Sequence, residues 1–160
     1  MKIAHIADVH IRKLKYHQEY KEVFSQLYEK LKEERVACTV IVGDIVHTKT
    51  DMSPEMVSLT SDFFSNLASI SPTYIILGNH DGNLKNKSRQ DAITPIIQAL
   101  DRENLVVLKD AGEREIDKGL TLNVLSVFDR DKWIQPTQPD NINIALYHGA
   151  ISNCQTDAGW

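Results

Sequence analysis

Short apolar runs alternate with helix-like periodicity over the first hundred residues of the chain. The runs 3–7, 38–42 and 73–77 have the length of buried strands, and the first two are apolar on both faces, as is typical of parallel strands. Between those two runs a helix is predicted from His17 to about Arg35, with an apolar face formed by Tyr20, Val23, Phe24, Leu27 and Leu31. Strands that alternate with helices predict a parallel sheet with right-handed crossovers.

A second helix is predicted to begin at Ser53-Pro54, because serine caps helix N-termini and proline suits the first turn. Its buried face would carry Met56, Leu59, Phe63 and Leu67. Asp91 is expected to cap a short third helix that reaches Leu100. The first hundred residues therefore predict an α/β fold.

The second half of the chain has a different pattern. Apolar residues alternate with polar ones from Leu120 to Phe128 and again from Ile142 to Leu146, which predicts two half-buried strands. The segment 109–119 is expected to be a turn-rich connection.

Each predicted parallel strand is followed by polar groups that bind metals. Carboxyl ends of parallel strands share one edge of a sheet, and that edge is where open α/β sheets bind ligands. A fourth set, His148-Gly149, follows the strand predicted at 143–147 and points to the same place if that strand joins the sheet. The three strand ends carry Asp8 and His10, then Asp44 and His47, then Asn79, His80 and Asp81.

Carboxylate, imidazole and amide groups together suit Mn²⁺, Fe²⁺ or Zn²⁺. A carboxylate shared by two ions holds them about 3.5–4 Å apart, the spacing used for two-metal hydrolysis. Asp44 is the natural shared ligand because it belongs to the central motif. Asp8 and His10 would complete one ion's ligands, and Asn79 and His148 the other's.

Two further histidines receive different interpretations. His80 directly follows a proposed ligand and is the candidate general acid, with Asp81 fixing its tautomer. His5 lies inside the first strand and is expected to be a packed core residue.

Length and composition set the broad class. The 160 residues suffice for one domain, and the net charge of −4 argues against a protein that coats nucleic acid, although not against an enzyme. No apolar run is long enough to span a bilayer, and the first residues do not form a signal peptide. Cys38 and Cys154 are not expected to form a disulfide, so an intracellular protein is expected.

These motifs resemble those of the calcineurin-like metallophosphoesterases: D-x-H at Asp8 and His10, G-D at Gly43-Asp44, G-N-H-D at Gly78–Asp81 and H-G at His148-Gly149. The sequence GDIVH further resembles the SbcD-type DNA-repair nucleases. That resemblance implies a β-sandwich flanked by helices (αββα) and a Mn²⁺-dependent 3′→5′ exonuclease and endonuclease acting on DNA. It also implies a homodimer in the full-length form and a coiled-coil ATPase partner of the SbcC/Rad type. His47 would approach the scissile phosphate.

One motif of the family is absent from the sequence. The family closes its site with G-H-x-H, whereas no histidine follows His148 in this chain. Residues 1–160 are therefore expected to be the N-terminal portion of a phosphoesterase domain, incomplete at its C-terminus, or a naturally shortened member of the family. We expect this chain alone to bind metal weakly and to have little or no activity.

Two basic clusters flank the predicted site and could receive the phosphates of a DNA strand: Arg12, Lys13 and Lys15, and Lys85, Lys87 and Arg89. Charged loop residues are equally often only solvated. A small-molecule phosphodiesterase of the same superfamily is the main alternative, and a non-catalytic scaffold is a third. A protein phosphatase is disfavoured because such enzymes show G-D-x-V-D-R-G and G-N-H-E.

Overall fold

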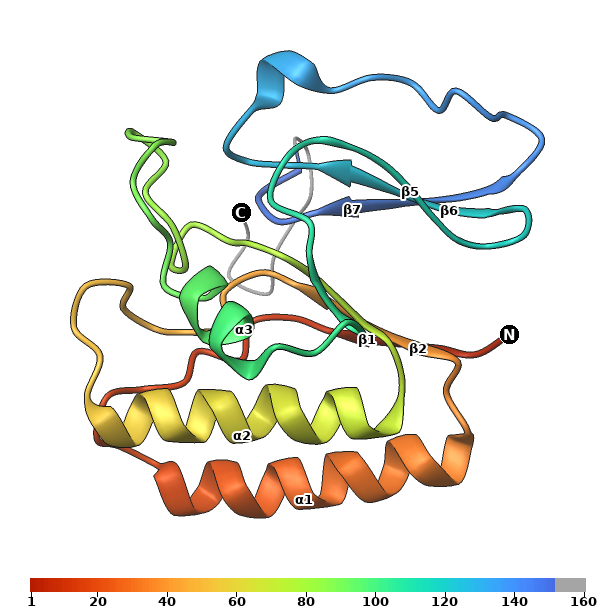
Figure 1. Cartoon of the computed structure of the whole chain (residues 1–160). Coiled ribbons are helices and arrows are strands. Elements are labelled where there is room, and N and C mark those ends of the chain that lie inside the picture. Colours follow the sequence, from red (N-terminus) through yellow and green to blue (C-terminus); the bar gives the residue numbers. More distant parts are fainter. Residues whose placement is uncertain (152–160) are drawn as a thin grey trace.

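The computed structural model of the protein describes residues 1–151, which form two stacked sheets with helices outside the first (Figure 1). The first sheet is parallel and contains, in spatial order, β1 (Ile3–Ile6), β2 (Cys38–Val42), β3 (Thr73–Ile76) and β4 (Leu105–Val107). The second sheet contains β5 (Gly112–Asp117), β6 (Leu120–Leu125) and β7 (Ile142–Tyr147), with β5 antiparallel and β7 parallel to β6. The predicted α/β sandwich is thereby confirmed.

The helices α1 (His17–Glu34) and α2 (Pro54–Ile70) cover the outer face of the first sheet (Figure 1), as the sequence periodicity predicts. Ser53 caps α2, accepting the Met56 N–H at 3.3 Å. Phe24 and Leu31 of α1 are buried, whereas Val23, which was assigned to the same face, is 59% exposed. The helices described here include none that is long and apolar enough to cross a membrane.

The strand β2 is the centre of the sandwich, and all five of its residues are buried. Ile41 packs toward the helices, while Val40 and Val42 pack against Leu122, Val124 and Leu146 of the second sheet. The prediction of two fully covered apolar strands is correct for β2 and wrong for β1. Because β1 pairs only with β2, it is an edge strand, and His5 is exposed rather than packed in the core.

Two predictions for the second half of the chain are wrong in detail. The segment 109–119 contains β5, and β6 is buried on both faces rather than half-buried. The polar side chains of β6 tolerate burial because they are paired: Thr121 accepts from Asn141 at 3.1 Å, and Asn123 donates to Asn143 at 2.9 Å. Cys38 is buried, and its proposed lack of a partner is untested because Cys154 lies outside the described residues.

The short helix α3 (Thr94–Leu100) starts over a buried carboxylate. Asp91 is 4% exposed and accepts the N–H groups of Ile93 at 3.0 Å and Thr94 at 2.7 Å, so it bonds the first turn as predicted, although the N-cap position itself is Ile93. Its other oxygen pairs with the Lys109 ammonium at 3.0 Å. Burial acts to raise the pKa of Asp91, but the bonds from Thr94 and Lys109 outweigh it and hold the pKa below 3.8.

Replacing Asp91 by asparagine should lower the free energy of unfolding by roughly 2–3 kcal/mol at neutral pH, because Lys109 loses its partner and the helix its anionic cap. A depressed folded-state pKa stabilises the protein above the ordinary pKa and loses this effect as the pH falls. The difference between wild type and Asp91→Asn should therefore shrink below about pH 4 in urea denaturation. The exposed Asp101→Asn serves as the control, and an equal loss in both variants would contradict this account.

Candidate metal centre

The loops that leave β1 and β2 remain hydrogen-bonded beyond the ends of the strands. The Asp8 N–H donates to the Gly43 carbonyl at 3.2 Å, and the His10 N–H donates to the Asp44 carbonyl at 3.0 Å. These bonds place Asp8 and His10 directly beside Asp44. The close approach of the two loops follows from sheet pairing that continues past the regular strands.

Three proposed ligands occupy a strained backbone conformation. Asp8, His10 and Asp44 have φ values of 55°, 50° and 53°, in the left-handed region that favours glycine. Such a conformation costs about 1–3 kcal/mol per residue and persists where the surrounding structure imposes it. Left-handed backbone at three proposed ligands is consistent with loops whose conformation is constrained around a site.

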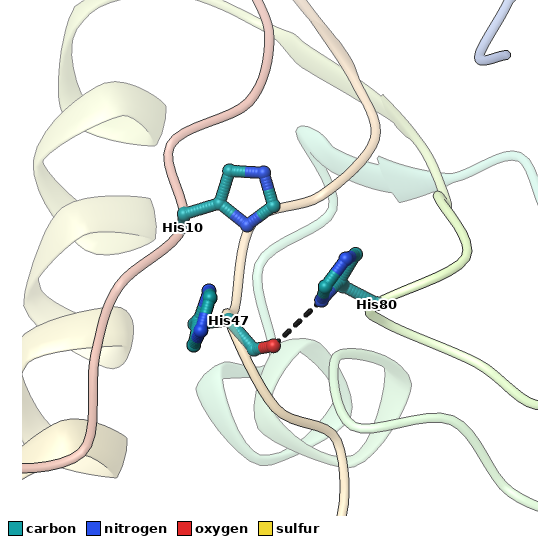
Figure 2. Close-up of side chains that lie close together, drawn as sticks. All are labelled: His10, His47 and His80. Carbon is teal, nitrogen blue, oxygen red and sulfur yellow. Dashed lines mark hydrogen bonds between the residues drawn. The ribbon is translucent and has the colours of Figure 1, made fainter. Parts of the chain in front are cut away.

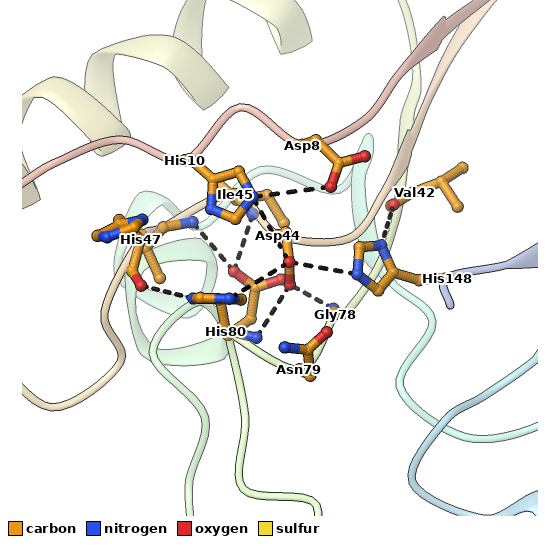
Figure 3. A network of polar contacts seen from close by, with 12 residues as sticks. Asp8, His10, Val42, Asp44, Ile45, His47, Gly78, Asn79, His80 and His148 are labelled. Carbon is orange, nitrogen blue, oxygen red and sulfur yellow. Dashed lines mark hydrogen bonds and ion pairs between the residues drawn. The ribbon is translucent and has the colours of Figure 1, made fainter. Parts of the chain in front are cut away.

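Asp44 is the centre of the cluster, and its side chain is only 5% exposed. Its Oδ1 accepts the His80 N–H at 2.9 Å, while its Oδ2 faces the Nε2 atoms of His148 at 3.3 Å, His10 at 3.6 Å and His80 at 3.9 Å (Figure 3). Within residues 1–151 no Lys or Arg forms an ion pair with this carboxylate. A buried carboxylate surrounded by imidazole nitrogens beyond ordinary hydrogen-bond distance is suited to a cation between them.

His148 reaches the cluster from the second sheet, directly after β7. Its Nδ1–H donates to the Val42 carbonyl at 2.9 Å, which leaves the Nε2 lone pair facing Asp44. A backbone carbonyl on the second ring nitrogen is a common arrangement for metal-binding histidines. Gly43 makes room for the ring, since a Cβ there would lie 2.5 Å from His148 Nδ1. The fourth motif therefore meets the other three, although its strand belongs to the other sheet.

The described groups divide into two ligand sets around Asp44. Asp8, His10 and Asp44 each offer one atom, and these atoms lie within 4.8 Å of one another. On the other side of Asp44 stand His148 and the exposed Asn79, whose neighbour His80 is tied to Asp44 through its N–H (Figure 3). Both sets combine oxygen and nitrogen ligands of the kinds that Mn²⁺, Fe²⁺ and Zn²⁺ accept. The chain therefore contains a cluster that fits divalent metal.

His80 is oriented by a carbonyl, not by Asp81. Its Nδ1–H donates to the His47 carbonyl at 2.6 Å, so Nε2 is the atom that faces the site. The prediction that Asp81 fixes the His80 tautomer is therefore wrong. Asp81 is fully buried and accepts the backbone N–H groups of Ile45, Val46 and Gly78 at 2.9–3.1 Å. Its carboxylate ties the loop after β2 to the loop after β3.

Burial raises the pKa of Asp81 to about 6, against the opposing effect of the backbone N–H donors. Asp81 is thus a positioning residue that holds Asp44 and His80 in register. Gly78 also contributes to this register, because a Cβ at that position would overlap Asp44 Oδ1. Neither role has a signal in the sequence beyond the G-N-H-D motif itself.

His47 stands beside His80, with the two rings stacked at a centroid distance of 5.6 Å. Loss of hydration lowers the pKa of His47, and the Arg12 guanidinium lowers it further. The structure thus brings His47 and His80 together with the five proposed ligands. Their catalytic roles stay predictions.

Within residues 1–151, each of the two basic clusters contains one lysine that forms an ion pair and other basic residues that do not. Lys13 forms an ion pair with Asp51, and Lys87 pairs with Asp131 at 3.2 Å. In the described part of the chain the ion pairs include none from Arg12, Lys15, Lys85 or Arg89.

One basic residue escaped the sequence analysis. The Lys49 Nζ donates to the carbonyl of Asn79 at 2.7 Å, and Lys49 and Arg89 line a polar pocket of about 150 Å³. Because Lys49 follows His47 by only two residues, the sequence could have identified it as a residue near the site. A second cleft, of about 350 Å³, is bounded by His5, Asp8 and His148. The second cleft is thus lined by proposed metal ligands, whereas the first is linked to the site only through the contact of Lys49 with Asn79.

Two stacked sheets with these ligands at the strand ends fit a metallophosphoesterase. The sequence profile of the calcineurin-like phosphoesterase family matches residues 1–160, and the chain belongs to that family. The resemblance to the superfamily is thereby confirmed, whereas the finer resemblance to SbcD-type nucleases stays a prediction.

Two viral proteins are similar in sequence to this chain. It is 43% identical to "Uncharacterized protein R555" of Acanthamoeba polyphaga mimivirus over 172 residues, covering 99% of this chain and 13% of that protein. It is 25% identical to "Putative phosphoesterase 244L" of Invertebrate iridescent virus 6 over 167 residues, covering 98% and 56%. The chain thus spans 13% and 56% of the lengths of these relatives.

The fold is similar to the crystal structure of the Pseudomonas putida nuclease MPE. The TM-score is 0.51 at 22% sequence identity, over 76% of this chain and 52% of that one. At this identity the likeness is one of fold.

Asp44→Asn should abolish the heat of Mn²⁺ binding in isothermal titration calorimetry, because both ligand sets share this carboxylate. Binding by the unaltered chain is expected to be weak, since no histidine follows His148 to complete the ligands. His5→Asn is the matched control, because His5 lines the same cleft without facing Asp44. Unchanged binding in Asp44→Asn would refute the site, and tight binding of two ions by the wild type would refute the weak-site expectation.

Proposed function

We propose that this chain carries the metal-binding half of a phosphodiesterase site that cuts DNA. The observation that carries the proposal is the buried Asp44 carboxylate, with histidines from three separate segments directed at its Oδ2. Such an arrangement matches the demand of two-metal hydrolysis for one shared carboxylate. The calcineurin-like family supplies the reaction class, phosphoester hydrolysis.

We propose two divalent cations, Mn²⁺ first and Fe²⁺ or Zn²⁺ as alternatives. Asp8, His10 and Asp44 would hold one ion, and Asp44, Asn79 and His148 the other. When bound, the pair would act as Lewis acids that absorb charge on the phosphate and activate the attacking water. Mn²⁺ is preferred because three of the five ligands supply oxygen and Mn²⁺ accepts carboxylate and amide oxygens readily.

The remaining residues of the site have roles that follow from their contacts. The His47 carbonyl fixes the His80 ring, so Nε2 is free to carry a proton toward the leaving oxygen. Loss of hydration lowers the pKa of His47, and we propose that its ring contacts the phosphate as a hydrogen-bonding group. Arg12 supplies the nearby fixed positive charge.

The proposal of DNA over a small phosphodiester rests on the surroundings of the site. Lys49, anchored on the Asn79 carbonyl, and Arg89 line a pocket next to the proposed ligands. Arg12 and Lys85 have no carboxylate partner among the described ion pairs, so each could receive a further phosphate of a strand. The fold is similar to that of the Pseudomonas putida nuclease MPE, which is compatible with the proposal of DNA as the substrate.

The direct test is hydrolysis of labelled DNA and of bis(p-nitrophenyl) phosphate with Mn²⁺, with and without EDTA. The chain alone is expected to show low activity, and any activity should vanish with EDTA or with Asp44→Asn. The small-molecule alternative would prevail if only the chromogenic substrate were cut. The scaffold alternative would prevail if neither were cut by a longer protein that contains this chain.

A charge-reversal variant separates DNA binding from phosphodiester hydrolysis. The double variant Arg12→Glu/Lys85→Glu should weaken DNA binding in fluorescence anisotropy and reduce the salt slope by about one per lost phosphate contact. Hydrolysis of the small substrate should persist. Lys30→Glu is the control, because Lys30 lies near the opposite end of α1 and pairs with Glu34. Equal loss of both activities in the double variant would contradict a DNA groove.

The coiled-coil ATPase partner and the homodimer stay predictions of the SbcD-type resemblance, since a single chain tests neither. The same holds for an intracellular location and for the incomplete domain.

A further inference from the structure

A second group of nitrogen ligands lies beside Asp44, and it consists of histidines alone. His10, His47 and His80 each offer one ring nitrogen, and these nitrogens lie within 4.8 Å of one another. The ring centroids are 4.9 Å apart for His10 and His80 and 5.6 Å apart for the other two pairs. Figure 2 shows the three rings gathered from three separate loops.

Two nitrogens of these three rings lack a partner. His10 Nδ1 and His47 Nδ1 are buried and accept or donate no hydrogen bond within the described residues. A buried polar atom left unpaired costs about 1–3 kcal/mol. A cation bound among the three rings would give these buried nitrogens a partner, so they point to a ligand.

We propose that His10, His47 and His80 form a separate site for one nitrogen-seeking transition metal, with Zn²⁺ as the type ion. Three imidazoles with an open fourth position are a known zinc ligand set, and imidazole suits Zn²⁺ better than Mn²⁺. Nitrogens bound to one Zn²⁺ at 2.0–2.1 Å must be closer than 4.8 Å, so the rings would close slightly on the ion. The three proposed ligands are all imidazoles, whereas the Asp44 sets are rich in oxygen, although the free Nε2 of His80 also lies 3.9 Å from Asp44 Oδ2.

His10 makes the two sites compete. Its Nε2 faces Asp8 at 3.7 Å and Asp44 at 3.6 Å, while its buried Nδ1 has no hydrogen-bond partner among the described residues and is the atom that we assign to the histidine site. A neutral imidazole has one lone pair, so one nitrogen binds metal while the other carries the proton. With metal at Nδ1, the Nε2–H would donate to the Asp8 and Asp44 carboxylates. With metal at Nε2, the Nδ1–H remains inside the cluster.

The consequence is that Zn²⁺ would block Mn²⁺ binding at the ligand set that contains His10. Zn²⁺ in the histidine site would take His10 away from the Asp8–Asp44 set and would occupy His47 and His80, the residues proposed to contact the phosphate and the leaving group. Zn²⁺ is then expected to displace Mn²⁺ from the ligand set that contains His10, without requiring any carboxylate itself.

The test uses binding alone, so it is independent of whether the protein cuts DNA. Zn²⁺ affinity is measured by competition with a chromophoric chelator, and Mn²⁺ release by the electron paramagnetic resonance signal of free Mn²⁺. His47→Gln should weaken Zn²⁺ binding at least about tenfold and leave Mn²⁺ affinity within about twofold, because His47 serves only the histidine site. Asp8→Asn should do the reverse. X-ray absorption at the zinc edge should show three imidazole nitrogens.

Circular dichroism and thermal unfolding establish that both variants are folded. At the same Zn²⁺ concentration, the wild type should release more Mn²⁺ than His47→Gln, in which Zn²⁺ can compete only at the Asp44 sets. The proposal is overturned if His47→Gln binds Zn²⁺ as tightly as the wild type, if Asp8→Asn loses both ions, or if the wild type binds no Zn²⁺.

Discussion

The structure depends on the buried Asp44 carboxylate, with which no Lys or Arg of residues 1–151 forms an ion pair. Asp44 sits at the end of the fully buried central strand, on left-handed backbone, and Asp81 ties its loop, through the N–H groups of Ile45 and Val46, to Gly78 in the loop after β3. Burying such a charge is unfavourable unless it is paired or bound to metal. The left-handed conformations of Asp8 and His10 and the tight approach of Gly43 and Gly78 follow from packing ligands around this single oxygen pair.

The residues of the candidate site were predicted from the sequence more accurately than the strands of the two sheets that position them. Polar groups after apolar runs are visible in one dimension, so Asp8, Asp44 and Asn79 could be assigned to one edge of a parallel sheet. His148 was assigned to the same place, but its strand lies in the second sheet, and only packing between sheets brings it there. The strand β5 was missed because its charged residues hide the alternation, and the exposed His5 was misassigned because pairing order is not readable from β1 alone.

Side-chain orientation was the part that sequence could not supply. The rings of His80 and His148 are both oriented by hydrogen bonds to backbone carbonyls. Because every residue has a backbone carbonyl, such a contact cannot be predicted from residue types. Asp81 was read as the partner of His80 because it is adjacent, whereas its carboxylate bonds backbone in the opposite direction. His10 has neither nitrogen fixed in this way, and this freedom underlies the proposed choice between a carboxylate-rich site and a histidine-only site.

The central claim is that Asp44 is shared between two cations. Crystals of the protein soaked in Mn²⁺ and measured at the manganese absorption edge test this directly, since anomalous scattering locates each ion without assumption about its ligands. The account predicts two peaks about 3.5–4 Å apart, one on each side of the Asp44 carboxylate, with His10 next to one and His148 next to the other. Manganese peaks remote from Asp44, with that carboxylate left unbound, would contradict it.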